Sequence, residues 1–229
     1  MKHIADKIDV YLEVGKKRTI AGAIEWPGWC RVGRDEDTAL QALFDYGPRY
    51  ARLLEATPLG FQTPVDRSAF AVVERLEGST TTDFGAPDAS PSRDTQPVDA
   101  AELQRLQTLL KACWQAFDKA VQMATGKELR KGPRGGGREL GEIARHVLGA
   151  DASYLGRLAW KFKPDEAAQL DDELRRSRQA ILDALVAAAQ GELPTYGPRG
   201  GVMWTPHYFV RRVSWHILHH AWEIEDRVA

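Results

Sequence analysis

The sequence has little of what marks a secreted or membrane protein. Only two of its 229 residues are cysteine, Cys30 and Cys113, which is too few for a disulfide scaffold. We therefore expect free thiols in a reducing compartment. No apolar run approaches the length of a membrane span, and the first residues are too polar for a signal peptide. The expected location is cytoplasmic, with no membrane partner.

An excess of charge of one sign is also missing. The 31 lysines and arginines nearly balance the 32 acidic residues, for a formal net charge of −1. Because no global field would attract a polyanion, we expect no nucleic-acid partner. Hydrophobic residues make up 43% of the chain, which is ample for a core. At 229 residues, the chain is long enough for one large domain or two smaller ones.

The first third of the chain has the pattern of an α+β module. Apolar and polar residues alternate over residues 8–14, the period of a half-buried strand, and residues 19–25 continue as a second strand. A Gly/Pro-containing loop then leads into a helix that starts at Asp35 and that Gly47-Pro48 should kink or break. A further strand follows at residues 70–76. We expect residues 1–78 to form a small antiparallel sheet with a helix.

Composition changes sharply between the two halves. Residues 79–98 are rich in Ser, Thr, Pro, Gly and Asp, and are too polar and too interrupted to pack on their own. We expect this segment to be a linker or a long surface loop.

Residues 99–229 show helical spacing of apolar residues throughout. Asp99 can cap a first helix, and the glycines at 135–137 precede a second. Pro164 opens a third segment, and the fourth helix starts near Pro206. Four amphipathic helices over about 130 residues predict an all-α four-helix bundle.

Three histidines carry the strongest functional signal. His216 and His220 are four residues apart on the last helix, so they lie about 40° from each other around it and one turn apart along it. His146 lies at the edge of the apolar face of another helix. Three imidazoles in this arrangement would bind a divalent metal ion and leave positions open for water or substrate, as in catalytic zinc sites. His219, three residues from His216, is the weaker alternative ligand.

Glu223 lies one turn beyond His220 on the same face. It could be a fourth ligand, an acceptor that fixes the imidazole tautomer, or a general base. A reading without metal also stays open. In that reading, the histidines are residues at the edge of the core that hydrogen-bond to Glu223, Asp151 or Tyr154.

The pentapeptide GPRGG occurs twice, each time ahead of a histidine-bearing helix. Arg134 and Arg199 belong to these repeats and could hold a carboxylate or phosphate of a small-molecule substrate on glycine-rich backbone. The alternative is that both repeats are flexible turns with solvated arginines.

The segment IARHVLGADASYL, followed some seventy residues later by RRVSWHILHHAWEIEDR, resembles the DinB/YfiT-like superfamily over about residues 99–229. The resemblance implies a four-helix bundle with His146 as the first metal ligand and His216 and His220 as the other two. It also implies a zinc- or nickel-like ion and, for an enzyme, a low-molecular-weight thiol of the mycothiol, bacillithiol or glutathione type as cofactor or partner. Such bundles often pair, so a homodimer is possible.

Two functions follow from this resemblance. The first is a metal-dependent transferase or hydrolase that activates a thiol or a water molecule. The alternative is a non-catalytic binding or regulatory protein whose metal, if present, is structural.

The N-terminal run IAGAIEWPGWCRVGRDEDTALQALFDYGPRYARLL, followed by FAVVERLEG, resembles the HicB-type antitoxin fold more loosely. Pro27-Gly28 and Gly33-Arg34-Asp35 match its loop and helix start. This resemblance implies the fold of residues 1–78 and not the antitoxin role, because no segment of the sequence looks like a separate DNA-binding element.

Overall fold

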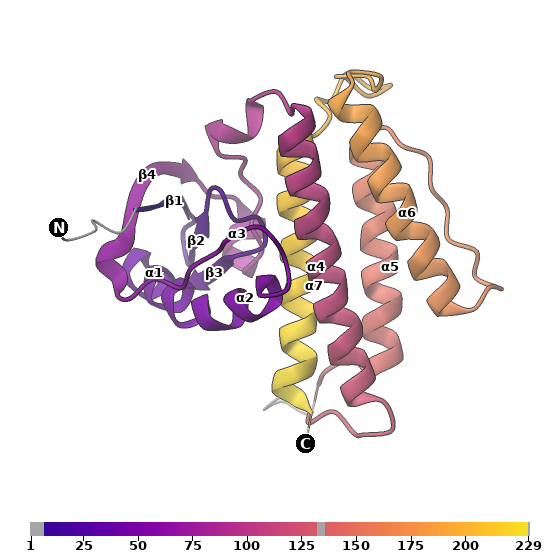
Figure 1. The fold of residues 1–229 in the computed structure, drawn as a ribbon, viewed down its shortest axis with the longest axis horizontal. Coiled ribbons are helices and arrows are strands. Elements are labelled where there is room, and N and C mark those ends of the chain that lie inside the picture. The colour runs from indigo at the N-terminus through magenta and orange to yellow at the C-terminus, as the bar shows by residue number, and fades with distance from the viewer. Residues whose placement is uncertain (1–6, 132–135, 229) are drawn as a thin grey trace. The chain divides into compact units, whose positions relative to one another are not determined.

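The chain consists of two compact units, Met1–Gln96 and Pro97–Ala229, in a computed structural model that describes residues 7–131 and 136–228. The first unit holds a four-stranded sheet with short helices, and the second holds four long helices (Figure 1). Both agree with the fold class that the sequence predicts, an α+β module followed by a helical bundle.

The sheet has the strand order β3-β2-β1-β4. Its strands are β1 (Ile8–Val14), β2 (Thr19–Ala23), β3 (Cys30–Gly33) and β4 (Phe70–Glu77). The pairs β1–β2 and β2–β3 are antiparallel, as expected, but β4 runs parallel to β1, so the sheet is mixed. Two helices connect β3 to β4. This helical connection crosses over the sheet and brings the chain to the edge beside β1, where β4 pairs in parallel.

Strand β1 is buried on both faces, where the alternating sequence predicted one exposed face. Tyr11 and Glu13 are fully buried, like their apolar neighbours Val10 and Leu12. Tyr11 is opposite Gly22 on β2, and a Cβ atom added at Gly22 would lie 2.5 Å from the tyrosine ring. The tyrosine therefore packs over the space that a glycine leaves open.

The expected break at Gly47-Pro48 divides the predicted helix into α1 (Glu36–Asp45) and α2 (Gly47–Leu54). Asp35 caps α1 by accepting a hydrogen bond from the Thr38 backbone N–H at 2.8 Å. Pro48 falls in the first turn of α2, where its missing N–H leaves no helical hydrogen bond unmade.

The polar segment that follows β4 is anchored to the first unit. It contains helix α3 (Thr80–Phe84), and its backbone N–H groups at Asp88 and Ala89 donate to the buried carboxylate of Glu13 at 3.0 Å. The Thr82 hydroxyl donates to the same carboxylate. One buried acid thus supplies the acceptors for three hydrogen-bond donors of this polar segment.

The second unit contains α4 (Ala100–Ala124), α5 (Leu140–Arg157), α6 (Leu170–Ala189) and α7 (Pro206–Arg227). Asp99 caps α4, as predicted, by accepting from the Glu102 backbone N–H at 2.8 Å. Helix α7 starts at the predicted Pro206, behind Thr205. Helix α6 begins six residues after Pro164, because residues 158–169 form a connection without a helix.

The four helices do not simply alternate in direction. Helices α4 and α7 run one way and α5 and α6 the other, so the connection between α5 and α6 returns along the bundle (Figure 1). Helix α7 packs against both α4 and α5 and has the most buried residues of these helices. Within the described residues, no helix is both long enough and apolar enough to cross a bilayer.

Candidate metal centre

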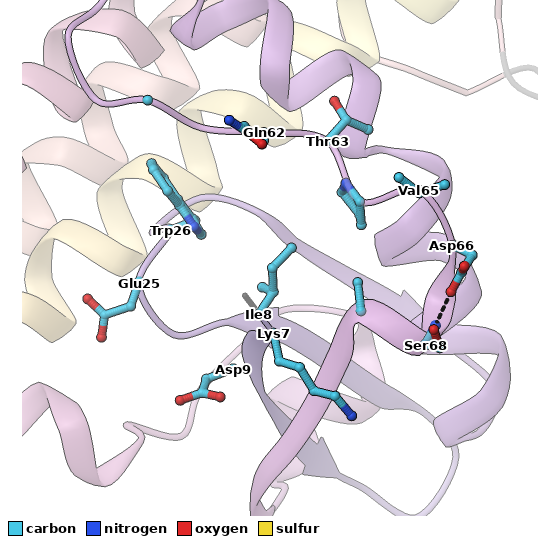
Figure 2. Close-up of a pocket in the computed structure, with 13 residues that line it drawn as sticks. Lys7, Ile8, Asp9, Glu25, Trp26, Gln62, Thr63, Val65, Asp66 and Ser68 are labelled. Carbon is cyan, nitrogen blue, oxygen red and sulfur yellow. Dashed lines mark hydrogen bonds between the residues drawn. The ribbon is translucent and has the colours of Figure 1, made fainter. Parts of the chain in front are cut away.

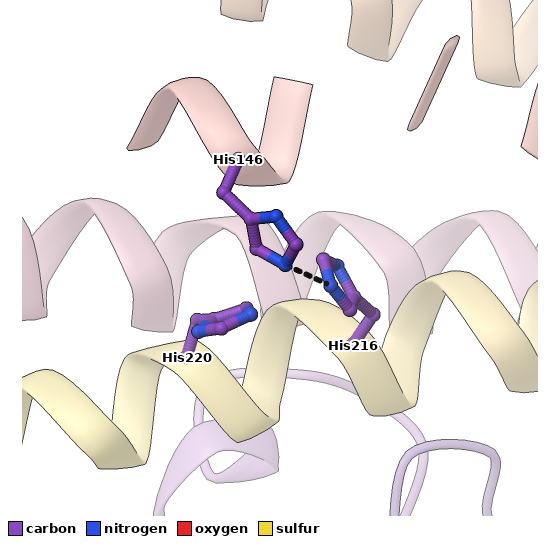
Figure 3. A group of neighbouring side chains, drawn as sticks. All are labelled: His146, His216 and His220. Carbon is purple, nitrogen blue, oxygen red and sulfur yellow. Dashed lines mark hydrogen bonds between the residues drawn. The ribbon is translucent and has the colours of Figure 1, made fainter. Parts of the chain in front are cut away.

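Three imidazole rings meet between α5 and α7. One ring nitrogen from each of His146, His216 and His220 lies within 4.8 Å of the other two (Figure 3). The Nε2 atoms of His146 and His216 are 3.2 Å apart, and the three ring centroids are separated by 4.6–5.0 Å. The structure therefore brings together all three histidines that the sequence selected.

The antiparallel packing of α5 and α7 explains this meeting. His216 and His220 occupy successive turns on one face of α7, as their spacing predicts. Both are almost fully buried, at 7% and 4% exposure, whereas His146 is partly exposed. The cluster therefore has a closed side formed by α7 and a more open side at His146.

The environment keeps two of these imidazoles neutral. Burial, helped by nearby His220 and His146, lowers the pKa of His216 to about 2. Burial also lowers the pKa of His146, together with the positive charge of Arg138, against an opposing effect of Glu223. Because neutral imidazole is the form that binds metal ions, both lone pairs are available at neutral pH.

A chain of hydrogen bonds supports His220 from behind. Its Nδ1 lies 2.8 Å from Oε2 of Glu223, and Oε1 of Glu223 accepts from Nη1 of Arg227 at 2.8 Å. Arg227 also donates through Nε to the Arg130 carbonyl at 2.9 Å. The hydrogen bond with His220 lowers the pKa of Glu223 to about 2, with a smaller contribution from Arg227 and against the effect of partial burial. The carboxylate is therefore charged. A charged acceptor at Nδ1 leaves Nε2 of His220 as the ligand atom.

The donor set fits a divalent metal ion. Two nitrogens at about 2.0–2.1 Å from a tetrahedral zinc ion would be about 3.3 Å apart, close to the 3.2 Å between His146 and His216. Two imidazole nitrogens at that distance need either a shared proton or a cation between them, since facing lone pairs repel. The buried Nδ1 of His216 has no hydrogen-bond partner among the described residues, so its tautomer is less firmly held than that of His220.

Arg199, His219 and Asp151, which the sequence also suggested, do not join this cluster. Arg199 is exposed in the turn before α7, where Gly197 N–H donates to the Gly201 carbonyl at 2.8 Å. Arg134 lies outside the described residues. His219 is exposed and stacks on Trp215. Asp151 is buried, and its Oδ2 accepts from the Ser177 hydroxyl at 3.3 Å, so it supports α6 rather than a histidine.

Sequence reasoning missed Arg212 and understated Tyr154. Arg212 is buried one turn before His216, and the Tyr154 ring lies edge-on to His216 with centroids 5.7 Å apart. An arginine inside a run such as VRRVSW gives no sign of which residue faces inward. Only the i,i+4 relation of Arg212 to His216 could have drawn attention to it.

A separate hollow of about 720 Å³ lies in the first unit (Figure 2). Its lining includes three acidic residues, Asp9, Glu25 and Asp66, together with Lys7 and Trp26. Glu25 pairs with Arg93, and Asp66 accepts from the Ser68 backbone N–H at 2.7 Å. Two of these carboxylates, Glu25 and Asp66, already have partners, and the hollow does not point to a particular ligand.

Comparison with known proteins supports the assignment of the bundle. The family model described as the DinB superfamily matches residues 109–224, a range that includes all three clustered histidines. The chain belongs to the DinB superfamily. No curated protein and no solved structure matches it. The DinB match covers none of the first unit, so the expected likeness of residues 1–78 to the HicB-type fold stays a prediction.

Proposed function

We propose that this DinB-superfamily protein binds one divalent metal ion, Zn²⁺ or Ni²⁺, through His146, His216 and His220, and that the centre is catalytic. The observation that carries the proposal is the convergence of three imidazole nitrogens from two helices within 4.8 Å, with burial favouring neutral rings. Imidazole ligands suit both metals, so the donor set alone does not choose between them.

A bound ion would supply Lewis acidity, lowering the pKa of a thiol or water molecule in an open position. Three protein ligands are the number found in catalytic zinc sites, whereas structural sites have four. The partly exposed side at His146 is where a substrate would approach, because His216 and His220 are covered by the bundle.

Glu223 acts in this proposal as a positioning residue. Its carboxylate holds Nδ1 of His220 and is itself held by Arg227. With a pKa of about 2, it is a poor proton acceptor near pH 7, where an efficient general base has a pKa close to the working pH. The hydrogen-bonded acceptor role is therefore the one the geometry favours among the three that the sequence left open.

The reaction class rests on superfamily resemblance. Transfer of a group to a low-molecular-weight thiol is our first choice, and hydrolysis by an activated water is the second. The non-catalytic alternative, a structural ion in a binding or regulatory protein, differs in one measurable respect, because a structural ion has no exchangeable position for a thiol.

Elemental analysis of the untreated protein tests metal binding. We expect close to one equivalent of zinc or nickel in the wild type and a loss of most of it in His220→Ala. His219→Ala is the matched control, since this neighbouring histidine on the same helix lies outside the cluster. A wild-type protein that stays metal-free after incubation with either ion would overturn the proposal.

Substitution with Co²⁺ separates a catalytic from a structural ion. A thiol that enters an open position, such as glutathione or 2-mercaptoethanol, should produce a thiolate charge-transfer band in the near ultraviolet. If a chelator unfolds the protein and neither thiol produces the charge-transfer band, the structural alternative is supported.

A further inference from the structure

Arg212 on α7 is a buried cation with little polar compensation. The residue is 7% exposed, and its Nε and Nη1 atoms have no hydrogen-bond partner among the described residues. Arginine stays protonated in proteins and offers five N–H donors. Buried charges normally have a carboxylate or several carbonyl oxygens around them, because removing an ion from water is otherwise unfavourable. Two buried guanidinium nitrogens without a hydrogen-bond acceptor therefore indicate a position where the acceptor atoms of a ligand would bind.

Aromatic rings surround the guanidinium instead. The Cζ atom of Arg212 lies 5.6 Å from the ring centroid of Tyr154, 5.8 Å from that of Trp204 and 5.4 Å from that of Trp215. Cation–π contacts within about 6 Å offset part of the lost hydration. The rings hold the charged group in place, and the Tyr154 hydroxyl is hydrogen-bonded to the guanidinium. Nε and Nη1 of Arg212 remain without an acceptor among the described residues.

This cation lies beside the proposed metal centre. Arg212 is four residues before His216, one turn along the same face of α7. Tyr154 connects the two, because its ring contacts both the guanidinium and the ring of His216. The charge of Arg212 also contributes to the lowered pKa of His216.

The charges around this position leave room for an anion. Glu223 is engaged with His220 and Arg227 at the other end of the cluster. Burial raises the pKa of Asp151 to about 7, and its side chain faces Ser177 and the charge of Arg178. With a divalent ion in place, positive charge would dominate the side of the centre that Arg212 occupies.

We propose that Arg212 binds a carboxylate group of the ligand whose reactive atom occupies the open side of the His146–His216–His220 centre. This inference rests on the proposed function and adds a substrate class to it, a molecule with a carboxylate a short distance from its metal-binding group. A single guanidinium within an aromatic shell matches the single charge and the paired oxygens of one carboxylate. Tyr154, Trp204 and Trp215 are each partly exposed, so only a layer of rings separates the guanidinium from solvent.

Acetate and acetamide are probes of equal size that differ in charge. We would load the full-length protein with Zn²⁺, verify its metal content, and titrate both probes by calorimetry and thermal shift. Acetate should bind and raise the Tm, and acetamide should do neither. Arg212→Met should lower acetate affinity at least tenfold with metal content unchanged. Arg157→Met is the matched control, since Arg157 is an exposed arginine near the same Trp204 ring and should leave acetate binding within twofold.

The failures of the two proposals are distinguishable. A wild type without metal overturns the metal centre, and the acetate–acetamide comparison on that protein still decides the role of Arg212. Equal response to both probes, or acetate binding retained in Arg212→Met, overturns the carboxylate site, because acetate would then bind the metal ion alone or nowhere. Tighter binding of inorganic phosphate than of acetate overturns the assigned class. If Arg212→Met does not fold, Arg212→Lys takes its place, and an acetate affinity equal to the wild type contradicts the proposal.

Discussion

Nδ1 of His220 lies 2.8 Å from Oε2 of Glu223, one turn further along α7. This contact joins the proposed metal centre to the last turn of the helix, because Glu223 in turn accepts from Arg227. The carboxylate fixes the imidazole so that its other nitrogen faces His146 and His216. Outer contacts of this kind are what distinguish an organised metal site from three neighbouring histidines.

Glu223→Gln should weaken zinc binding roughly 10–100-fold without removing a ligand, because a neutral amide holds the imidazole less firmly. Competition with a chromophoric chelator measures the change. Glu128→Gln, at an exposed position outside the cluster, should leave zinc affinity unaltered. Equal affinity in wild type and Glu223→Gln would remove the positioning role assigned to this carboxylate.

Asp151 should make the bundle less stable as pH rises. Burial raises its folded-state pKa to about 7, above the 3.8 expected for the unfolded chain. Between these values the unfolded state has lost a proton that the folded state keeps. The free energy of unfolding therefore falls with increasing pH, by at most about 1.4 kcal/mol per pH unit, and levels off above the folded pKa.

Asp151→Asn lacks this ionisation, so its stability relative to wild type should increase from pH 4 to pH 7 and stay constant above pH 8. Urea unfolding at several pH values provides the measurement. Asp183→Asn, which changes an exposed acid on α6, should show no such trend. A pH-independent difference for Asp151→Asn would contradict the raised pKa.

Glu13→Ala should loosen the segment that follows β4. The substitution removes the acceptor for the Thr82 hydroxyl and for the backbone N–H groups of Asp88 and Ala89. We expect a loss of about 2 kcal/mol or more in the free energy of unfolding and faster proteolysis within residues 79–96. Glu77→Ala, at the exposed end of β4, is the control. Unchanged cleavage in Glu13→Ala would mean that other contacts hold the segment.

Two glycines should respond to alanine in opposite directions. A Cβ atom at Gly22 would lie 2.5 Å from the Tyr11 ring, so Gly22→Ala should cost about 1–3 kcal/mol. A Cβ atom at Gly149, within α5, meets nothing within 4 Å, and alanine should stabilise the helix there by about 0.5–1 kcal/mol. Thermal unfolding of both variants checks the signs, and a stabilising Gly22→Ala would contradict the packing of Tyr11.

The pairing of His216 and His220 was predictable because its geometry is local, whereas the approach of His146 depends on how two helices pack. The separation of His216 and His220 fixes their common face on any α-helix, and apolar spacing places His146 on a neighbouring one. The superfamily resemblance then indicated that these helices pack together, and the structure brings the three rings within reach of one ion.

Features that depend on contacts distant in sequence were not predictable in the same way. The alternating pattern of β1 does not reveal that Glu13 is fully buried, because its acceptors serve a segment some seventy-five residues later. The parallel placement of β4 follows from the crossover, which residue patterns do not specify. Arg212 shows the same difficulty, since its burial depends on rings from α5 and from the turn before α7.

The link from Arg227 to the Arg130 carbonyl has a practical consequence for protein engineering. Residues just after α4 brace the final turn of α7, and that turn orients the histidine at the centre through Glu223. A chain truncated before Arg227 would keep all three clustered histidines but lose the hydrogen bonds from Arg227 to Glu223 and to the Arg130 carbonyl. An affinity tag for purification should therefore not be fused directly after this turn.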